Sequence, residues 1–214
     1  SSGSEAIDFL IKLLRFGAVA RGEPTRRTII GRHGSYHGGT LASASVTGGH
    51  HEEFGLPLPG FEHVAQVDYH GDREPGETTA EYSTRRAEEL EALISGQPMG
   101  SIAAMIAEPV SFSAGFKLPP PEYFPAITSV LAAHGIELVI DEVITGFGRT
   151  GNLFGSETLG LNPAHVAIAK GITSGYFPLS AIGLGRDLYD ALEAGSDKIG
   201  TLAHASTFAA HPVG

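Results

Sequence analysis

The sequence predicts an α/β protein with a mostly parallel central sheet flanked by helices. Short apolar, β-branched segments of strand length alternate with longer segments whose apolar residues recur at helical spacing. Such alternation is typical of βαβ units, in which neighbouring strands run parallel. Glycine is also abundant, at 29 of 214 residues, as expected where the backbone must approach a ligand closely.

The first half of the chain contains two helical and two strand-like segments. Residues 5–15 carry apolar residues at helical spacing and a basic last turn, and Gly17 is expected to end this helix. Residues 27–33 and 64–67 are expected to be strands, and residues 84–94 a charged amphipathic helix.

The second half repeats this alternation. The apolar segment 102–107 is expected to be a strand ending at Glu108, and residues 122–134 a helix that stops at Gly135. Residues 136–141 form the next expected strand. The remaining expected elements are strands at 165–170 and 181–184 and a helix at 186–193.

Two polar segments, 48–60 and 69–79, are expected to be long loops, which in a compact domain are usually functional or mobile. The first contains His-His-Glu-Glu at 50–53, a group that could suggest a metal. Adjacent histidines lack the i, i+4 spacing of a helical zinc motif, so a solvated loop is the better interpretation and we expect no metal site.

The composition narrows the class of protein. A formal net charge of −10 disfavours binding to nucleic acid or to anionic membranes. The chain has no cysteine, which excludes a disulfide framework and a cysteine-based metal site or nucleophile, and which fits a reducing compartment. No segment approaches the ~20 apolar residues of a membrane helix. We therefore expect a cytoplasmic globular protein.

Two of the expected strands end on charged residues, Asp141 and Lys170. In open α/β sheets, ligands bind in the crevice outside the carboxyl ends of the strands. A lysine and an acid at that edge suit pyridoxal 5′-phosphate (PLP), which needs a lysine for a Schiff base and an acidic partner for its pyridinium nitrogen. A buried Asp–Lys ion pair, or two unrelated charges facing water, would show the same pattern.

Two segments could bind a phosphate. Ser2, Gly3 and Ser4 stand at the start of the first expected helix, where free N–H groups attract anions, although an ordinary helix cap or a linker has the same sequence. The Gly-x-Gly-x-x-Gly motif at 146–151 matches a dinucleotide fingerprint. The acid required ~20 residues later is missing, because residues 162–175 contain none. We therefore do not interpret the chain as an NAD-dependent dehydrogenase.

Further polar and aromatic residues follow other expected strands. Tyr36 and His37 come shortly after residues 27–33, where an aromatic ring can stack on a planar ligand or simply pack. Glu108 follows residues 102–107 and brings another acid to the same edge, unless it is only a solvated strand end.

Residues 141–151 (DEVITGFGRTG) and 169–179 (AKGITSGYFPL) resemble the class III aminotransferases, which are PLP enzymes of fold type I. Within that class the chain is most similar to ω-amino acid or amine:pyruvate transaminases. The resemblance implies that residues 1–214 are the PLP-binding large domain of that fold. The N-terminal segment and the C-terminal small domain of the family have no counterpart in them.

The resemblance also implies roles for individual residues. Lys170 would hold the cofactor and move protons, and Asp141 would keep the pyridine nitrogen protonated. Tyr36 and Val143 would lie on opposite faces of the ring. The full set of expected cofactor-binding residues is Gly3, Ser4, Tyr36, His37, Glu108, Asp141, Val143, Lys170 and Thr207.

One position departs from the family pattern, because Ser111 stands where a glutamine commonly follows Glu-Pro-Val. By resemblance, Glu108 lies near the 3-oxygen side of the ring, so the departure affects the hydrogen bonding expected there. Thr207 matches a threonine that reaches the phosphate of the neighbouring subunit's cofactor, which implies a homodimer with shared active sites.

The function implied is transfer of an amino group from an amine or ω-amino acid to a keto acid, with pyruvate as the expected acceptor. An aminomutase or amino-acid racemase of the same class would use the same residues. A non-catalytic derivative of the fold is a further alternative. The retention of Lys170, Asp141, Tyr36 and the Gly3–Ser4 pair argues against that last alternative.

Overall fold

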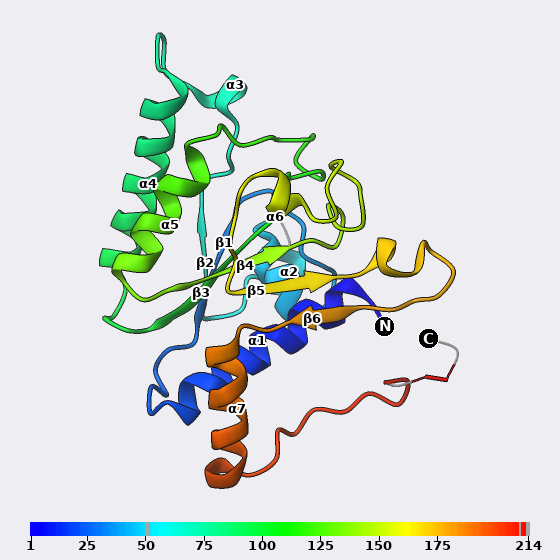
Figure 1. Cartoon of the computed structure of the whole chain (residues 1–214). Coiled ribbons are helices and arrows are strands. Elements are labelled where there is room, and N and C mark those ends of the chain that lie inside the picture. Colours follow the sequence, from blue (N-terminus) through cyan, green and yellow to red (C-terminus); the bar gives the residue numbers. More distant parts are fainter. Residues whose placement is uncertain (50–51, 210, 213–214) are drawn as a thin grey trace.

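The chain folds around a six-stranded sheet with helices on both faces (Figure 1). The computed structural model describes residues 1–49, 52–209 and 211–212. All neighbouring strands are parallel except β5 and β6, which confirms the predicted α/β class. In spatial order, the strands are β2 (Phe61–Val64), β1 (Thr28–Arg32), β3 (Ile102–Ala107), β4 (Glu137–Asp141), β5 (His165–Ile168) and β6 (Ala181–Gly183).

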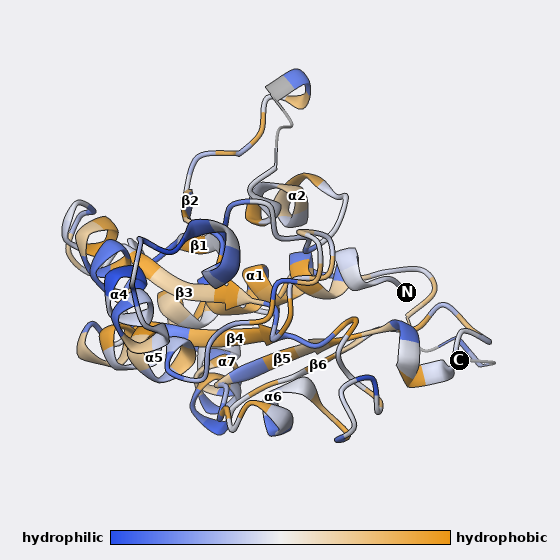
Figure 2. Ribbon diagram, turned by 90° about the horizontal axis from the view of Figure 1, so that it is seen from above, coloured by the Kyte–Doolittle hydropathy of each residue, from blue (hydrophilic) through white to orange (hydrophobic). Residues whose placement is uncertain are grey.

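The helices form two layers. One face is covered by α1 (Gly3–Ala20), α2 (Leu41–Thr47) and α7 (Arg186–Ile199), and the other by α4 (Thr79–Ser95) and α5 (Tyr123–Ala133). The short helices α3 (Tyr69–Asp72) and α6 (Gly155–Thr158) and the 3-10 turns η1 (Glu52–Phe54) and η2 (Lys170–Thr173) lie in the connections. Figure 2 shows the hydrophobic strands β3 and β4 between helices whose outer residues are hydrophilic.

The strands supply both cores by alternation. Ile106 of β3 packs toward α1, whereas Met105 packs toward α4 and α5. Val139 and Ile140 of β4 divide in the same way, and all four side chains are fully buried. Complete burial of one such side chain contributes roughly 1.5–3 kcal/mol. Two-sided burial explains why these strands are continuous apolar runs in the sequence.

The register of the central strands places their carboxyl ends at one edge of the sheet. Ala107, the last residue of β3, pairs with Ile140, and Asp141 pairs with Ala167 of β5. Residues that follow β3, β4 and β5 therefore emerge side by side, as expected for the site.

Gly17 does not end the first helix, and that prediction was wrong. α1 runs on to Ala20, with Gly17 buried in its interior. A Cβ at this position would overlap the side chain of Leu188 in α7. The glycine therefore allows two helices to pack closely, and the helix continues because that tertiary contact outweighs the unfavourable helix propensity of glycine.

Other boundaries also differ from expectation. β2 lies three residues earlier than the expected 64–67, because its partner β1 pairs Ile29 with Phe61. The expected strand 165–170 stops at Ile168, and Lys170 opens η2 instead. α4 starts at Thr79 rather than at 84, where Thr78 and Glu81 form a capping box. α2, α3, α6 and η1 were not predicted, and α7 extends past the expected 193.

Candidate active site

Eight of the nine predicted site residues line one cavity at the carboxyl edge of the sheet. Asp141 ends β4, Glu108 follows β3, and Lys170 lies two residues after β5. The other five are Gly3, Ser4, Tyr36, His37 and Val143. Thr207 is not among them, because it lines a separate, larger groove along α1. The topology thus brings together residues that are far apart in the sequence.

Asp141 is a buried carboxylate held by one donor on each oxygen. Its side chain is 4% exposed, and its Oδ2 lies 2.8 Å from Nδ1 of His37. The backbone N–H of Val143 donates to Oδ1 at 3.0 Å. Because an ionised carboxylate only accepts hydrogen bonds, His37 donates from Nδ1. The His37 ring is itself buried, and its Nε2 has no partner among the described residues.

Glu108 is the second buried acid of the cavity. Burial is the largest influence on this side chain and raises its pKa above the ordinary value. The hydroxyl of Ser111 donates to Glu108, and Nε2 of Gln66 lies 3.1 Å from that hydroxyl oxygen. Ser111, the departure noted in the sequence, therefore supplies a hydrogen bond to Glu108 itself.

Arg32 supports Glu108 from β1 and was missed by the sequence analysis. Its side chain is 0% exposed, and Nη2 donates to the backbone oxygen of Glu108 at 2.8 Å. The same nitrogen lies 4.0 Å from Oε2 of Glu108, while Nε and Nη1 have no partner among the described residues. A charged residue ending an apolar strand was the available signal, since it is the pattern that drew attention to Asp141.

The start of α1 forms the next wall of the cavity. Ser2 caps the helix by accepting a hydrogen bond from the backbone of Glu5, and the N–H groups of Gly3 and Ser4 point out of the first turn. The hydroxyl of Ser4 accepts from the backbone of Gly39 at 3.1 Å. The positive end of a helix dipole and free N–H groups suit an anion such as a phosphate.

A glycine lets the loop after β1 approach this helix end. Gly38 has a φ of +139°, and a Cβ on it would lie 2.6 Å from Oγ of Ser4. A side chain at Gly38 would therefore displace Ser4 from the cavity wall.

Lys170 has an unusual backbone and a free side chain. Its φ is +46°, in the left-handed region that non-glycine residues rarely adopt. The side chain is exposed, and its amine has no hydrogen bond or ion pair among the described residues. Tyr36, on the same cavity, is 47% exposed. Asp141 and Lys170 therefore do not form the buried ion pair that the sequence left open as an alternative.

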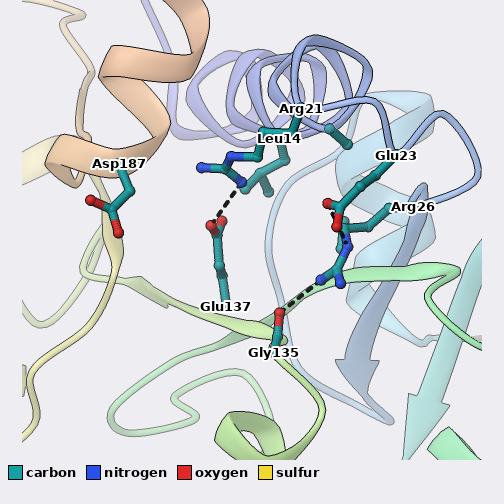
Figure 3. A pocket seen from close by; sticks show the side chains of 9 residues that line it. Leu14, Arg21, Glu23, Arg26, Gly135, Glu137 and Asp187 are labelled. Carbon is teal, nitrogen blue, oxygen red and sulfur yellow. Dashed lines mark hydrogen bonds and ion pairs between the residues drawn. The ribbon is translucent and has the colours of Figure 1, made fainter.

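A second cavity lies at the opposite, amino-terminal edge of the strands and has different chemistry (Figure 3). Its volume of about 280 Å³ exceeds the about 120 Å³ of the first cavity. Nη1 of Arg21 lies 3.3 Å from Glu137, and Nε of Arg26 lies 3.1 Å from Glu23. Both arginines thus face carboxylates already, so size alone does not identify the active site.

Two further sequence motifs were candidates for a binding site. His50 and His51 lie outside the described residues, and the residues that are described contain no His/Cys/Asp/Glu group that could hold a metal. The glycine motif at 146–151 forms a turn, and the helix after it begins only at Gly155. None of the described helices is long and apolar enough to span a membrane.

Comparison with known proteins agrees with this geometry. Residues 1–214 match the family model described as "Aminotransferase class-III". The chain is 43% identical to an uncharacterized aminotransferase of Sinorhizobium fredii, covering 100% of this chain and 46% of that protein. It is 40% identical to a vanillin aminotransferase of Capsicum frutescens, covering 100% of this chain and 47% of the other. It is also 42% identical to a probable gamma-aminobutyrate transaminase of Oryza sativa, covering 100% and 44%.

Solved structures show the same relationship. An omega-aminotransferase from Paracoccus denitrificans superimposes with a TM-score of 0.92 at 42% identity, covering 96% of this chain and 46% of that one. A thermostable omega transaminase variant from Pseudomonas jessenii reaches a TM-score of 0.94 at 38% identity, covering 97% and 46%. The chain spans about half the length of the curated relatives it matches. With a full-length family match and a shared fold, the chain belongs to the class III aminotransferases.

Proposed function

We propose that this chain is the PLP-binding large domain of a transaminase that moves an amino group from an amine or ω-amino acid to a keto acid. The observation that carries the proposal is the meeting of a free lysine, Lys170, and a buried carboxylate, Asp141, in one cavity beside the start of α1. Ordinary ion-pairing residues would instead neutralise each other, as they do at the amino-terminal edge.

The residues of the cavity fit PLP. The N–H groups of Gly3 and Ser4 would bind the phosphate, and the Asp141 carboxylate would hold a protonated pyridine nitrogen. His37 and Val143 leave Asp141 with one donor on each oxygen, so the carboxylate can still accept a third. When bound, PLP supplies an electron sink for the bonds around the substrate's amino carbon.

Each cavity residue would then have a definite task. Lys170 would hold the cofactor through Nζ and, once released by an incoming amine, would carry the proton between the substrate carbon and the cofactor. His37 would orient Asp141 through the 2.8 Å contact between its Nδ1 and Oδ2 of the carboxylate. Tyr36 and Val143 would pack on the two faces of the ring, and Glu108 would lie beside its 3-oxygen.

Substrates and partners extend the proposal further. One relative is named for gamma-aminobutyrate, an ω-amino acid, which supports an ω-amino acid donor. Another is named for vanillin, an aldehyde whose aminated counterpart is an amine, and pyruvate is the acceptor we propose. Thr207 lies outside the cavity, which agrees with a role at the site of a neighbouring subunit in a homodimer. We also propose a cytoplasmic location, on the basis of the acidic, cysteine-free composition.

Absorption spectroscopy of the purified full chain with PLP tests the reaction. We expect a visible band from lysine-bound cofactor, bleaching of that band by an amine, and its recovery on adding pyruvate. Bleaching and recovery by a single amino compound without any keto acid would favour an aminomutase or a racemase. Absence of the band at saturating PLP would refute the proposal.

A further inference from the structure

The lysine turn, η2 (Lys170–Thr173), packs against a loop. A buried acid outside the cavity holds that loop in place. Lys170 and Phe147 both have left-handed backbones, with φ values of +46° and +64°. A methyl group on Gly171 would lie only 3.0 Å from Cβ of Phe147 and 3.3 Å from the carbonyl oxygen of Gly146. Phe147 is therefore packed directly against the residue that follows Lys170.

Glu142 holds the loop that carries Phe147. Its side chain is fully buried, although it does not line the cavity. Oε2 accepts from the backbone of Gly155 at 2.9 Å, and Oε1 accepts from the backbone of Ser156 at 2.6 Å. The hydroxyl of Thr145 also donates to Oε2. One carboxylate thus joins the two ends of the segment 145–156.

Further contacts keep the loop folded over the lysine turn. The backbone N–H of Phe147 donates to the carbonyl oxygen of Leu153 at 2.6 Å. The Phe147 ring packs edge-on against Phe154, with centroids 5.7 Å apart. A loop closed in this way can resist the tendency of Lys170 to relax to an ordinary backbone conformation.

We propose that Glu142 is a positioning residue for Lys170, because it fixes the loop that presses Phe147 against Gly171 and so keeps the lysine turn left-handed. This inference rests on the proposed function, in which Lys170 holds the cofactor. It assigns to Glu142 a role in placing Nζ and no contact with cofactor or substrate.

Glu142→Gln is the most informative substitution. Both carboxylate oxygens accept backbone N–H groups, and an amide nitrogen cannot accept, so one buried N–H loses its partner. Glu157→Gln is a matched control, since Glu157 is an exposed residue of the same short loop helix, α6. Phe147→Ala and Gly171→Ala test the same path without touching Glu142, and they carry the test if Glu142→Gln fails to fold.

Binding of two cofactor forms distinguishes misplacement of Lys170 from a general loss of structure at the site. Pyridoxal phosphate links to a lysine, whereas pyridoxamine phosphate carries an amine and cannot. We expect Glu142→Gln to weaken pyridoxal phosphate binding about tenfold or more and pyridoxamine phosphate binding about twofold or less, because only the first needs Lys170 in place. Equal loss for both forms would overturn the inference.

Hydrogen exchange in the cofactor-free protein gives an independent readout. We expect about tenfold faster exchange in both 145–156 and 169–176 for Glu142→Gln, with no change in 169–176 for Glu157→Gln. Faster exchange confined to 145–156 would also overturn the inference. The proposed function fails separately, if the wild-type chain binds both cofactor forms without forming a covalent link to Lys170.

Discussion

The two edges of the sheet both carry charged residues, but these residues differ in whether they are ion-paired. At the amino-terminal edge, Arg21 faces Glu137 and Arg26 faces Glu23. At the carboxyl edge, Lys170 has no partner among the described residues, although the buried Asp141 lines the same cavity. Both arginines of the amino-terminal cavity are ion-paired, whereas the proposed ligand site leaves the exposed Lys170 amine available for a ligand.

The left-handed backbone of Lys170 is a second difference between the two edges of the sheet. A strained conformation at a non-glycine residue costs on the order of 1–3 kcal/mol and persists only where the surroundings impose it. The described residues at the amino-terminal edge that leave the α or β regions with a positive φ are glycines, such as Gly22 and Gly135. The strain is therefore placed where the proposed chemistry needs it.

Lys170→Ala should give the largest effect and should separate the two edges most clearly. We expect loss of covalent cofactor binding and a fall in transamination of roughly 10³-fold or more, because both the anchor and the proton carrier are removed. Absorption spectra and turnover assays check this, with Glu137→Gln as the amino-edge control. Near-normal turnover without Lys170 would mean that the carboxyl edge is not the active site.

Asp141→Asn should have the next largest effect. Cofactor should still bind through Lys170 and the start of α1, but a neutral amide holds the pyridinium proton poorly. We expect the half-reaction with an amine to slow by about 10²-fold or more, at a similar cofactor affinity. Stopped-flow measurement of that half-reaction is the test, and an unchanged rate would remove Asp141 from the mechanism.

The loss of folding stability at acidic pH should depend on residues at the amino-terminal edge. Burial raises the pKa of Glu137, but hydrogen bonding and charge from His165 and then Arg21 outweigh burial, so the net pKa lies below the ordinary value. The unfolded chain therefore binds more protons as pH falls, and stability is lost as the pH drops through the folded pKa. Urea unfolding across acidic pH should show this loss of stability. In Glu137→Gln, the loss between neutral and acidic pH should be smaller by about 1 kcal/mol.

The carboxyl edge should respond to pH with the opposite sign. Burial raises the pKa of Glu108, so the folded chain holds its proton more tightly than the unfolded chain. Its contribution is fully present below the ordinary pKa of glutamate and is lost as the pH rises through the folded pKa. Glu108→Gln should flatten this part of the pH profile, and an unchanged profile would show that Arg32 and His37 already compensate the charge.

A substitution that touches neither cavity should give the smallest effect. Thr78 caps α4 by accepting from the backbone of Glu81. Thr78→Ala should cost about 1 kcal/mol in the free energy of unfolding. PLP affinity should stay the same, and fluorescence-monitored unfolding with a parallel cofactor titration measures both. A change in PLP affinity would show that the site is coupled to distant helix stability.

Several elements could be read from the sequence because their signals are local. β3 at Ile102–Ala107 has the predicted bounds, and α5 lies within a residue of its predicted ends. Both depend on an apolar run or on helical spacing followed by Gly135, which adopts the left-handed conformation expected after a helix. Asp141 and Lys170 were likewise predictable, because parallel strands deliver their ends to a common edge.

Other features depend on contacts between distant segments. Gly17 seemed a helix stop until Leu188 of α7 was placed against it, and β2 took its register from β1. The importance of Glu142 could not be predicted, since nothing near it in the sequence shows that its side chain is buried. Arg32 gave a partial signal by ending an apolar strand, but its contact with Glu108 joins two different strands.

The sequence by itself determined the α/β class and the convergence of Lys170 with Asp141, because periodicity and strand ends are properties of neighbouring residues. It indicated the family through the resemblance of residues 141–151 and 169–179. Only the tertiary structure decided which charges are paired and which are not. Pairing depends on distances across the sheet, such as the 2.8 Å between His37 and Asp141, that residue order does not contain. Burial then gives each pairing its energetic weight, since an unpartnered polar group is costly only where water cannot reach it.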